Sequence, residues 1–191
     1  KFAAIDGDDK YLWRMHRTRL DAESIRDAVL SISGKLDLTM GGPSVKQFIQ
    51  TPGIHVTPVV DYLSFDVDRP ENYRRSVYRF IFRTLPDPFM ETLDCADASQ
   101  LTPVRSASVT ALQALTMLNN RFIVRQSEHI ALRLEGLAPD VPGRVGAAYE
   151  LILGRPATAH EVELVGRYVT QHGLANAVRM LLNSNEFMFV N

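Results

Sequence analysis

Hydrophobic residues recur at helical spacing within residues 11–33, a segment that contains neither proline nor glycine. Four of them follow the i, i+3, i+4, i+7 pattern of an amphipathic helix: Ile25, Ala28, Val29 and Ile32. Asp8 and Asp9 precede the segment and suit the N-terminal end of a helix, which favours negative charge. Gly34 follows it and readily adopts the left-handed conformation that ends many helices. We therefore predict a helix that begins after Asp9 and ends at Gly34.

A second helix is predicted over residues 71–84. Pro70 suits a first helical turn, and Pro86 ends the helical pattern because proline restricts the residue before it. Three apolar residues would form the buried face of this helix: Val77, Phe80 and Ile81. The predicted helix therefore packs its apolar side against the rest of the chain.

Between these two helices, glycine and proline punctuate residues 41–70. β-Branched and aromatic residues gather only at 53–65, which favours short strands there. Pro58 limits strand pairing to an edge, since it has no N–H to donate to a ladder. We predict at most a small two-stranded β excursion near residues 53–65.

The C-terminal half reads as a series of helices. Residues 106–134 are periodic, with a break at Asn119 and Asn120 because asparagine competes for local backbone hydrogen bonds. Thr158 and Glu161 fit the capping box that opens a helix. Three further helices are predicted at residues 144–153, 158–172 and 174–182.

These elements predict a mainly α, irregular helical fold with long loops. Its main helical part would span residues 1–138, and a C-terminal helical subdomain would span residues 139–191. The Pro139–Gly143 linker divides the two, and we expect them to pack together as one unit.

Composition narrows the function classes. The 191 residues are 46% hydrophobic and 23% charged, and 21 Lys and Arg against 22 Asp and Glu give a net charge of -1. No global positive field therefore attracts nucleic acid. No apolar run reaches the roughly 18–20 residues of a membrane span. The single cysteine, Cys95, stands between acidic residues, which disfavour a reactive thiolate.

Candidate chemistry is confined to charged side chains. On the predicted second helix, Arg75, Arg79 and Arg83 lie four residues apart and would form a cationic stripe. Such a stripe can hold phosphate, sulfate or carboxylate groups. The alternative is that these arginines pair with Glu23, Asp27 or Glu71 across a helix–helix contact, and the balanced net charge favours this pairing.

No catalytic, metal or cofactor site is predicted within this chain. The five histidines are scattered without the spacing of a zinc site. The loop at residues 41–44 is rich in glycine, but Ser44 lacks the second glycine of a nucleophile elbow.

Several blocks, which recur in order over nearly the whole chain, resemble the planctomycete-specific C-terminal domain of unknown function found in large cytochrome-c-associated secreted proteins. The blocks lie at residues 19–27, 33–37, 41–44, 74–78, 83–88, 112–119, 153–156 and 183–187. The family pattern begins before Lys1, so the chain is expected to be the C-terminal portion of that domain.

The resemblance implies an exported protein of the periplasm, cell envelope or extracellular space. It also implies haem c in other domains of the parent protein, and no cofactor in this chain. The expected partners are those other domains or the missing N-terminal portion, with cell-surface polysaccharide as a further candidate. The resemblance supplies no catalytic residue.

Two helices would contribute to one polar network, in which satisfied charges specify geometry. Its expected members are Arg19, Glu23, Arg26, Asp27, Arg75, Arg79 and Arg83. The preferred hypothesis is therefore a non-catalytic interaction or scaffold domain. The alternatives are part of an enzyme or redox assembly, with a site around Arg75, Arg79 and residues 41–44, and a module that binds anionic polysaccharide.

Overall fold

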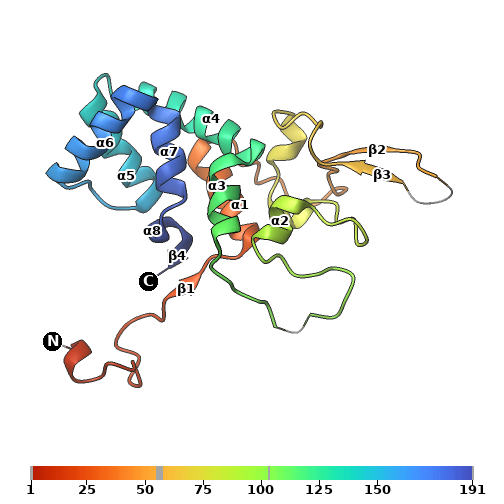
Figure 1. Ribbon diagram of the computed structural model, residues 1–191, viewed down its shortest axis with the longest axis horizontal. Coiled ribbons are helices and arrows are strands. Elements are labelled where there is room, and N and C mark those ends of the chain that lie inside the picture. Colours follow the sequence, from red (N-terminus) through yellow and green to blue (C-terminus); the bar gives the residue numbers. More distant parts are fainter. Residues whose placement is uncertain (1, 55–57, 103, 191) are drawn as a thin grey trace.

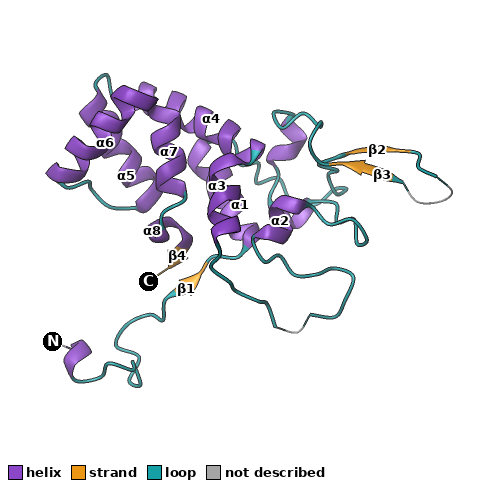
Figure 2. Cartoon of the chain, in the orientation of Figure 1, coloured by secondary structure: helices purple, strands orange, loops and turns teal. Residues whose placement is uncertain are grey.

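The computed structural model describes residues 2–54, 58–102 and 104–190. A β-hairpin and an N-terminal arm project from a body of packed helices (Figure 1). Helix is the dominant secondary structure (Figure 2). The prediction of a mainly α fold with a small β excursion is therefore confirmed.

The α-helices are α1 (Ala22–Ser33), α2 (Pro88–Thr92), α3 (Ala111–Asn119), α4 (Arg121–Leu137), α5 (Val141–Leu153), α6 (Ala159–His172), α7 (Leu174–Leu182) and α8 (Asn185–Met188). Single turns of 3-10 helix lie at Phe2–Ala4, Pro70–Tyr73 and Ser76–Tyr78. The strands form two antiparallel pairs: β1 (Thr18–Arg19) with β4 (Phe189–Val190), and β2 (Ile49–Thr51) with β3 (Val59–Asp61).

Helix α1 ends where the sequence predicts but begins later. Gly34 adopts the left-handed conformation with φ +74°, and its N–H closes the last turn. The predicted start after Asp9 is wrong, because Asp21 caps the helix by accepting from the Ser24 N–H at 2.8 Å. Upstream, the Asp6 carboxylate accepts from backbone N–H groups of residues 10 and 11, which stabilises turns instead of helix.

The predicted helix over residues 71–84 is wrong. The chain makes two 3-10 turns there, separated by extended backbone at Arg74 and Arg75. Instead of bonding to its own helix, the segment bonds to residues 37 and 45: the Val45 N–H donates to the Tyr78 carbonyl, and the Phe80 N–H donates to the Val45 carbonyl, both at 2.8 Å. These tertiary hydrogen bonds outweigh the local helical preference.

The C-terminal helices follow the sequence closely. Asn120 separates α3 from α4 and caps α4 by accepting from the Phe122 N–H, so the predicted break is confirmed. The capping box at Thr158 and Glu161 is also present in full.

Of the predicted strands, β3 lies inside residues 53–65 and its partner β2 lies just before them; residues 55–57 lie outside the described part of the chain.

The core lies between α1, α4, α5 and α7. Helix α4 packs on α1 and on α7, and α5 packs on α6 and α7. Five large apolar side chains are fully buried at the centre: Ile25, Met117, Ile130, Leu134 and Leu182. One hydrophobic cluster thus joins α1 with the helices beyond residue 139. No helix within the described residues is long and apolar enough to cross a bilayer.

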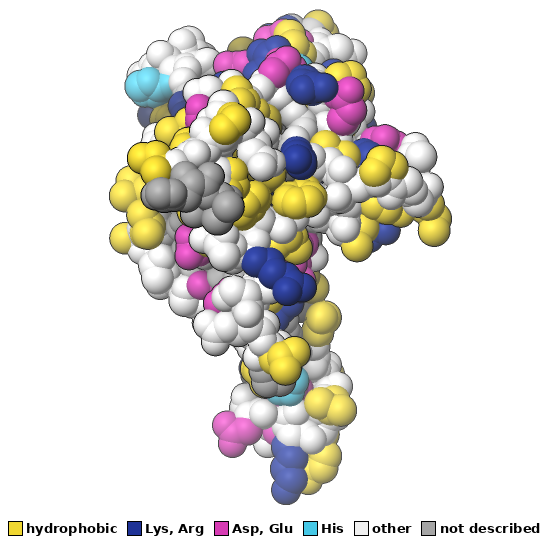
Figure 3. Space-filling model, turned by 90° about the vertical axis from the view of Figure 1, so that its right-hand side faces the viewer, with side chains coloured by type: hydrophobic (Ala, Val, Ile, Leu, Met, Phe, Trp, Pro, Cys, Tyr) yellow, Lys and Arg dark blue, Asp and Glu magenta, His cyan; other side chains and the backbone are white. Residues whose placement is uncertain are grey.

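The N-terminal arm, residues 2–17, is tied to the body where the chain begins β1. The β1–β4 pair brings Thr18 opposite Val190, next to the C-terminal end. Beyond this pair the arm projects away from the body (Figures 1 and 3). Six large apolar side chains of the arm are exposed: Phe2, Ile5, Tyr11, Leu12, Trp13 and Met15.

The capping box supplies a stability test within one helix. In Thr158→Ala, the Glu161 N–H loses its acceptor, and we expect a loss of about 1 kcal/mol in the free energy of unfolding. Thr170→Ala makes the same chemical change at an exposed interior position of α6 and should leave stability within about 0.5 kcal/mol. The urea midpoints of the two variants measure this difference, and equal midpoints would contradict the prediction.

Candidate functional site

Arg26 on α1 is the most deeply buried charged residue of the site, with 2% of its surface exposed. Its guanidinium donates to two backbone carbonyls of the irregular segment, those of Asn72 at 2.5 Å and Arg74 at 2.9 Å. The guanidinium also lies over the Phe122 ring. Burial, together with the nearby Arg79 cation, lowers the pKa of Arg26 to about 9. Arg26 thereby holds the irregular segment at residues 72–74 against α1.

Asp27, the next residue on α1, holds the same loop through its carboxylate. It accepts from the Ser76 N–H and the Ser76 hydroxyl, both at 2.7 Å. Arg75 approaches this carboxylate at 3.6 Å, but its side chain is 54% exposed. The N–H and hydroxyl bonds of Ser76 to Asp27, more than the Arg75 ion pair, therefore position the loop.

Arg79 is held by groups outside α1. Its Nε donates to the Gln47 side chain at 2.7 Å, and its Nη2 pairs with Asp87, the N-cap residue of α2. Only 10% of the Arg79 side chain is exposed. The arginine therefore joins the loop before β2 to the start of α2.

Glu23 pairs with Arg105, which no sequence pattern indicated. Arg105 donates to both carboxylate oxygens of Glu23, at 2.7 and 3.0 Å. Burial raises the pKa of Glu23, but the Arg105 hydrogen bonds outweigh it and the net shift is downward. Beside this pair, burial and the Glu23 charge raise the pKa of the Cys95 thiol to about 11. The thiol is thus kept protonated at neutral pH.

Arg19 belongs to a separate cluster. It pairs with Asp94 at 2.7 Å, and Asp94 also accepts from Ser108 and Gln113. These bonds tie the end of β1 to the loop after α2 and to α3. Of the seven predicted network residues, Arg26 and Arg75 share the Asp27 carboxylate, while Arg19, Glu23 and Arg79 form separate ion pairs with other partners.

The predicted stripe on one helical face does not form, because residues 75–83 are not an α-helix. Arg75 and Arg79 pair with different carboxylates, and the exposed Arg83 has no ion-pair partner within the described residues. Sequence reasoning missed Gln47, Asp87 and Arg105. Only Asp87 carried a signal, as an N-cap residue before Pro88.

A groove of about 750 Å³ runs between α1, α2 and residues 75–86. The three apolar residues predicted as a buried helix face lie here and are exposed instead: Val77 by 73%, Ile81 by 61% and Phe80 by 37%. They line the groove together with polar residues, which include six carboxylate and four guanidinium groups. The groove is therefore apolar on one wall and formally -2 in charge.

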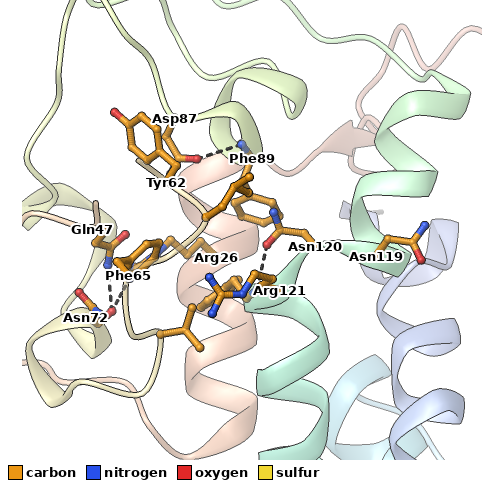
Figure 4. A pocket seen from close by; sticks show the side chains of 13 residues that line it. Arg26, Gln47, Tyr62, Phe65, Asn72, Asp87, Phe89, Asn119, Asn120 and Arg121 are labelled. Carbon is orange, nitrogen blue, oxygen red and sulfur yellow. Dashed lines mark hydrogen bonds between the residues drawn. The ribbon is translucent and has the colours of Figure 1, made fainter. Parts of the chain in front are cut away.

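A smaller cavity of about 170 Å³ adjoins the groove and shares Tyr62 and Asp87 with it (Figure 4). Arg26 lines this cavity from α1, and the start of α4 lines it with Asn120 and Arg121. Aromatic side chains supply much of the remaining wall: Tyr62, Phe65, Phe89 and Phe122. The cavity thus combines buried positive charge with aromatic surface.

The described histidines lie away from both hollows. His16 is on the arm, 3.6 Å from the Asp9 carboxylate, and His129 on α4 lies 3.0 Å from the Asp68 carboxylate. Outside residues 1, 55–57, 103 and 191, no group of three or more His, Cys, Asp or Glu side chains is placed to hold a metal ion.

A family model described as PSD1, protein of unknown function (DUF1553), matches residues 1–169. The matched residues include the groove, the cavity and helices α1 to α5. No curated protein and no solved structure matches the chain.

Arg26 and Arg75 offer a matched pair of substitutions at the site. Arg26→Met removes the guanidinium donor from the partly buried Asp27 carboxylate and from the Asn72 carbonyl, and we expect a loss of about 3–5 kcal/mol in unfolding free energy. Arg75→Met removes a half-exposed cation and should cost no more than about 1 kcal/mol. Equal costs in urea denaturation would contradict this assignment.

The Cys95 environment predicts a slow alkylation reaction. The rate with iodoacetamide should rise with pH around a midpoint near 11, against an ordinary pKa of 9.0. Glu23→Gln removes the neighbouring negative charge and should shift the midpoint downward. Glu91→Gln, an exposed residue of α2, is the control and should leave it in place. A midpoint near 9 in the native protein would refute the prediction.

Proposed function

The chain belongs to the PSD1 family of proteins of unknown function (DUF1553), and we propose that it is a non-catalytic, mainly helical interaction domain of a larger exported protein. Other parts of that protein would carry haem c, and this chain would carry no cofactor. The proposed location is the periplasm, cell envelope or extracellular space. The groove is the observation that carries this proposal, and the sequence resemblance supplies the context.

The groove has the chemistry of a surface that receives another polypeptide segment. Val77 and Ile81 are mostly exposed although they are large and apolar, and they line the groove together with Phe80. Contiguous exposed apolar surface of this kind marks interaction sites. The exposed apolar arm adds a second such surface.

Charge selects the occupant that we propose. Three of the four groove arginines are paired with carboxylates, whereas Glu91 and Asp97 have no ion-pair partner within the described residues. With a formal charge of -2, the groove complements an apolar segment that carries lysine or arginine. It disfavours the anionic polysaccharide that a free arginine stripe would hold.

The same contacts weigh against the proposal of an enzyme or redox site around Arg75, Arg79 and residues 41–44. Arg74 holds that loop, since its guanidinium donates to the carbonyls of residues 39, 41 and 43 and lies 3.8 Å from the centre of the Tyr78 ring. Arg79 is engaged with Asp87, and the Cys95 thiol is protonated at neutral pH. Arg74 therefore positions backbone, and Arg79 joins two side chains, so both are engaged in structural contacts.

Hydrogen exchange of residues 76–86 tests the proposal. We expect these amides to exchange at least about tenfold more slowly in the full parent polypeptide than in this chain alone, because a docked segment excludes water. Ile81→Asp in the parent should remove this protection. Leu132→Asp, at a similarly exposed apolar residue on α4, is the control and should preserve it. Equal exchange in the parent and the isolated chain would refute docking at the groove.

A further inference from the structure

The cavity beside Arg26 has a size and a lining that point to a small ligand. Its volume of about 170 Å³ is comparable with the roughly 150 Å³ cavity that accepts a benzene molecule in an engineered protein. A single six-membered ring therefore fits it. Aromatic walls from Phe65, Phe89 and Phe122 provide apolar contact for the faces of such a ring.

The cavity is rich in positive charge. Arg26 and Arg121 line it against a single carboxylate, that of Asp87, which is already engaged by Arg79. Arg26 is almost completely buried, yet among the described residues nothing accepts a hydrogen bond from its Nε. The Nε donor is therefore available to a ligand in the cavity.

The start of α4 adds to this preference. Asn120, Arg121 and Phe122 lie at the N-terminal end of a 17-residue helix and border the cavity (Figure 4). The helix dipole places partial positive charge at this end and favours anionic oxygen. Arg121 is exposed and has no ion-pair partner in the described part of the chain, so its guanidinium is available.

Amide side chains supply the remaining polar groups. The Asn72 side-chain oxygen receives no hydrogen bond from the described residues, although its Nδ2 is bound to the Asp66 carbonyl. Asn120 uses its oxygen as the α4 cap and has its Nδ2 free of described partners. Free amide donors and acceptors around a ring suit hydroxyl groups.

We propose that this cavity binds a carboxylate carried on a single ring, with the carboxylate between Arg26 and Arg121 and the ring against the phenylalanines. Either a sugar acid or an aromatic acid presents this chemistry. The amide groups favour the hydroxylated ring of a sugar acid. The site does not depend on docking at the groove, so either proposal can fail alone.

Titration of the whole chain with sodium glucuronate, sodium benzoate and glucose, followed by amide NMR shifts and calorimetry, tests the site. We expect at least one carboxylate to bind, with shifts centred on Asn72 and Phe122, and glucose to bind at least about tenfold more weakly. Preference for glucuronate assigns a sugar acid, and preference for benzoate assigns an aromatic acid. Equal binding of glucose, no binding of either acid, or shifts centred on Ile81 in the groove would overturn the proposal.

Arg121→Glu is the decisive variant, because Arg26 substitutions weaken the fold. Glutamate suits the first turn of a helix, so the variant should fold while it repels the carboxylate and lowers affinity at least about tenfold. Arg167→Glu makes the same charge change on α6, where the arginine is 64% exposed and is not part of the cavity lining. This control should retain binding, and equal affinities of the two variants would overturn the assignment.

Discussion

The buried guanidinium of Arg26 is the interaction on which the irregular half of the molecule depends. It lies on a helix that the core fixes firmly, and it donates to carbonyls of a loop segment that lacks regular secondary structure. A buried charge without partners is strongly unfavourable, so the loop carbonyls and the guanidinium stabilise each other. The position of residues 72–76 therefore follows from α1.

From that anchor the path of the next residues is determined. Ser76 is held by Asp27, and Arg79 is held by Gln47 and Asp87, so the 3-10 turn between them lies between α1 and the start of α2. The apolar side chains of this stretch then have no core to enter. They line the groove, and their exposure is a consequence of where the polar contacts hold the backbone.

The same anchor shapes the smaller cavity. Arg26 lines one side of the cavity. The start of α4 lines another side, because Asn120 ends α3 and caps α4 at that point. One residue thus contributes to fold and candidate site together. A ligand that binds the folded chain at this cavity would also stabilise the fold.

The sequence by itself determined the regular part of the protein. Gly34, Asn120 and the Thr158 capping box act within a few residues, so local chemistry located the end of α1 and the starts of α4 and α6. Local chemistry could not predict the conformation of residues 71–84. Their sequence has a helical pattern, but the segment forms hydrogen bonds with Val45 and Asp37 instead of an α-helix. Nor could local chemistry pair Glu23 with Arg105, since 82 residues separate them. Only the tertiary structure decided which charges meet and which apolar residues stay exposed, because those outcomes depend on contacts between distant segments.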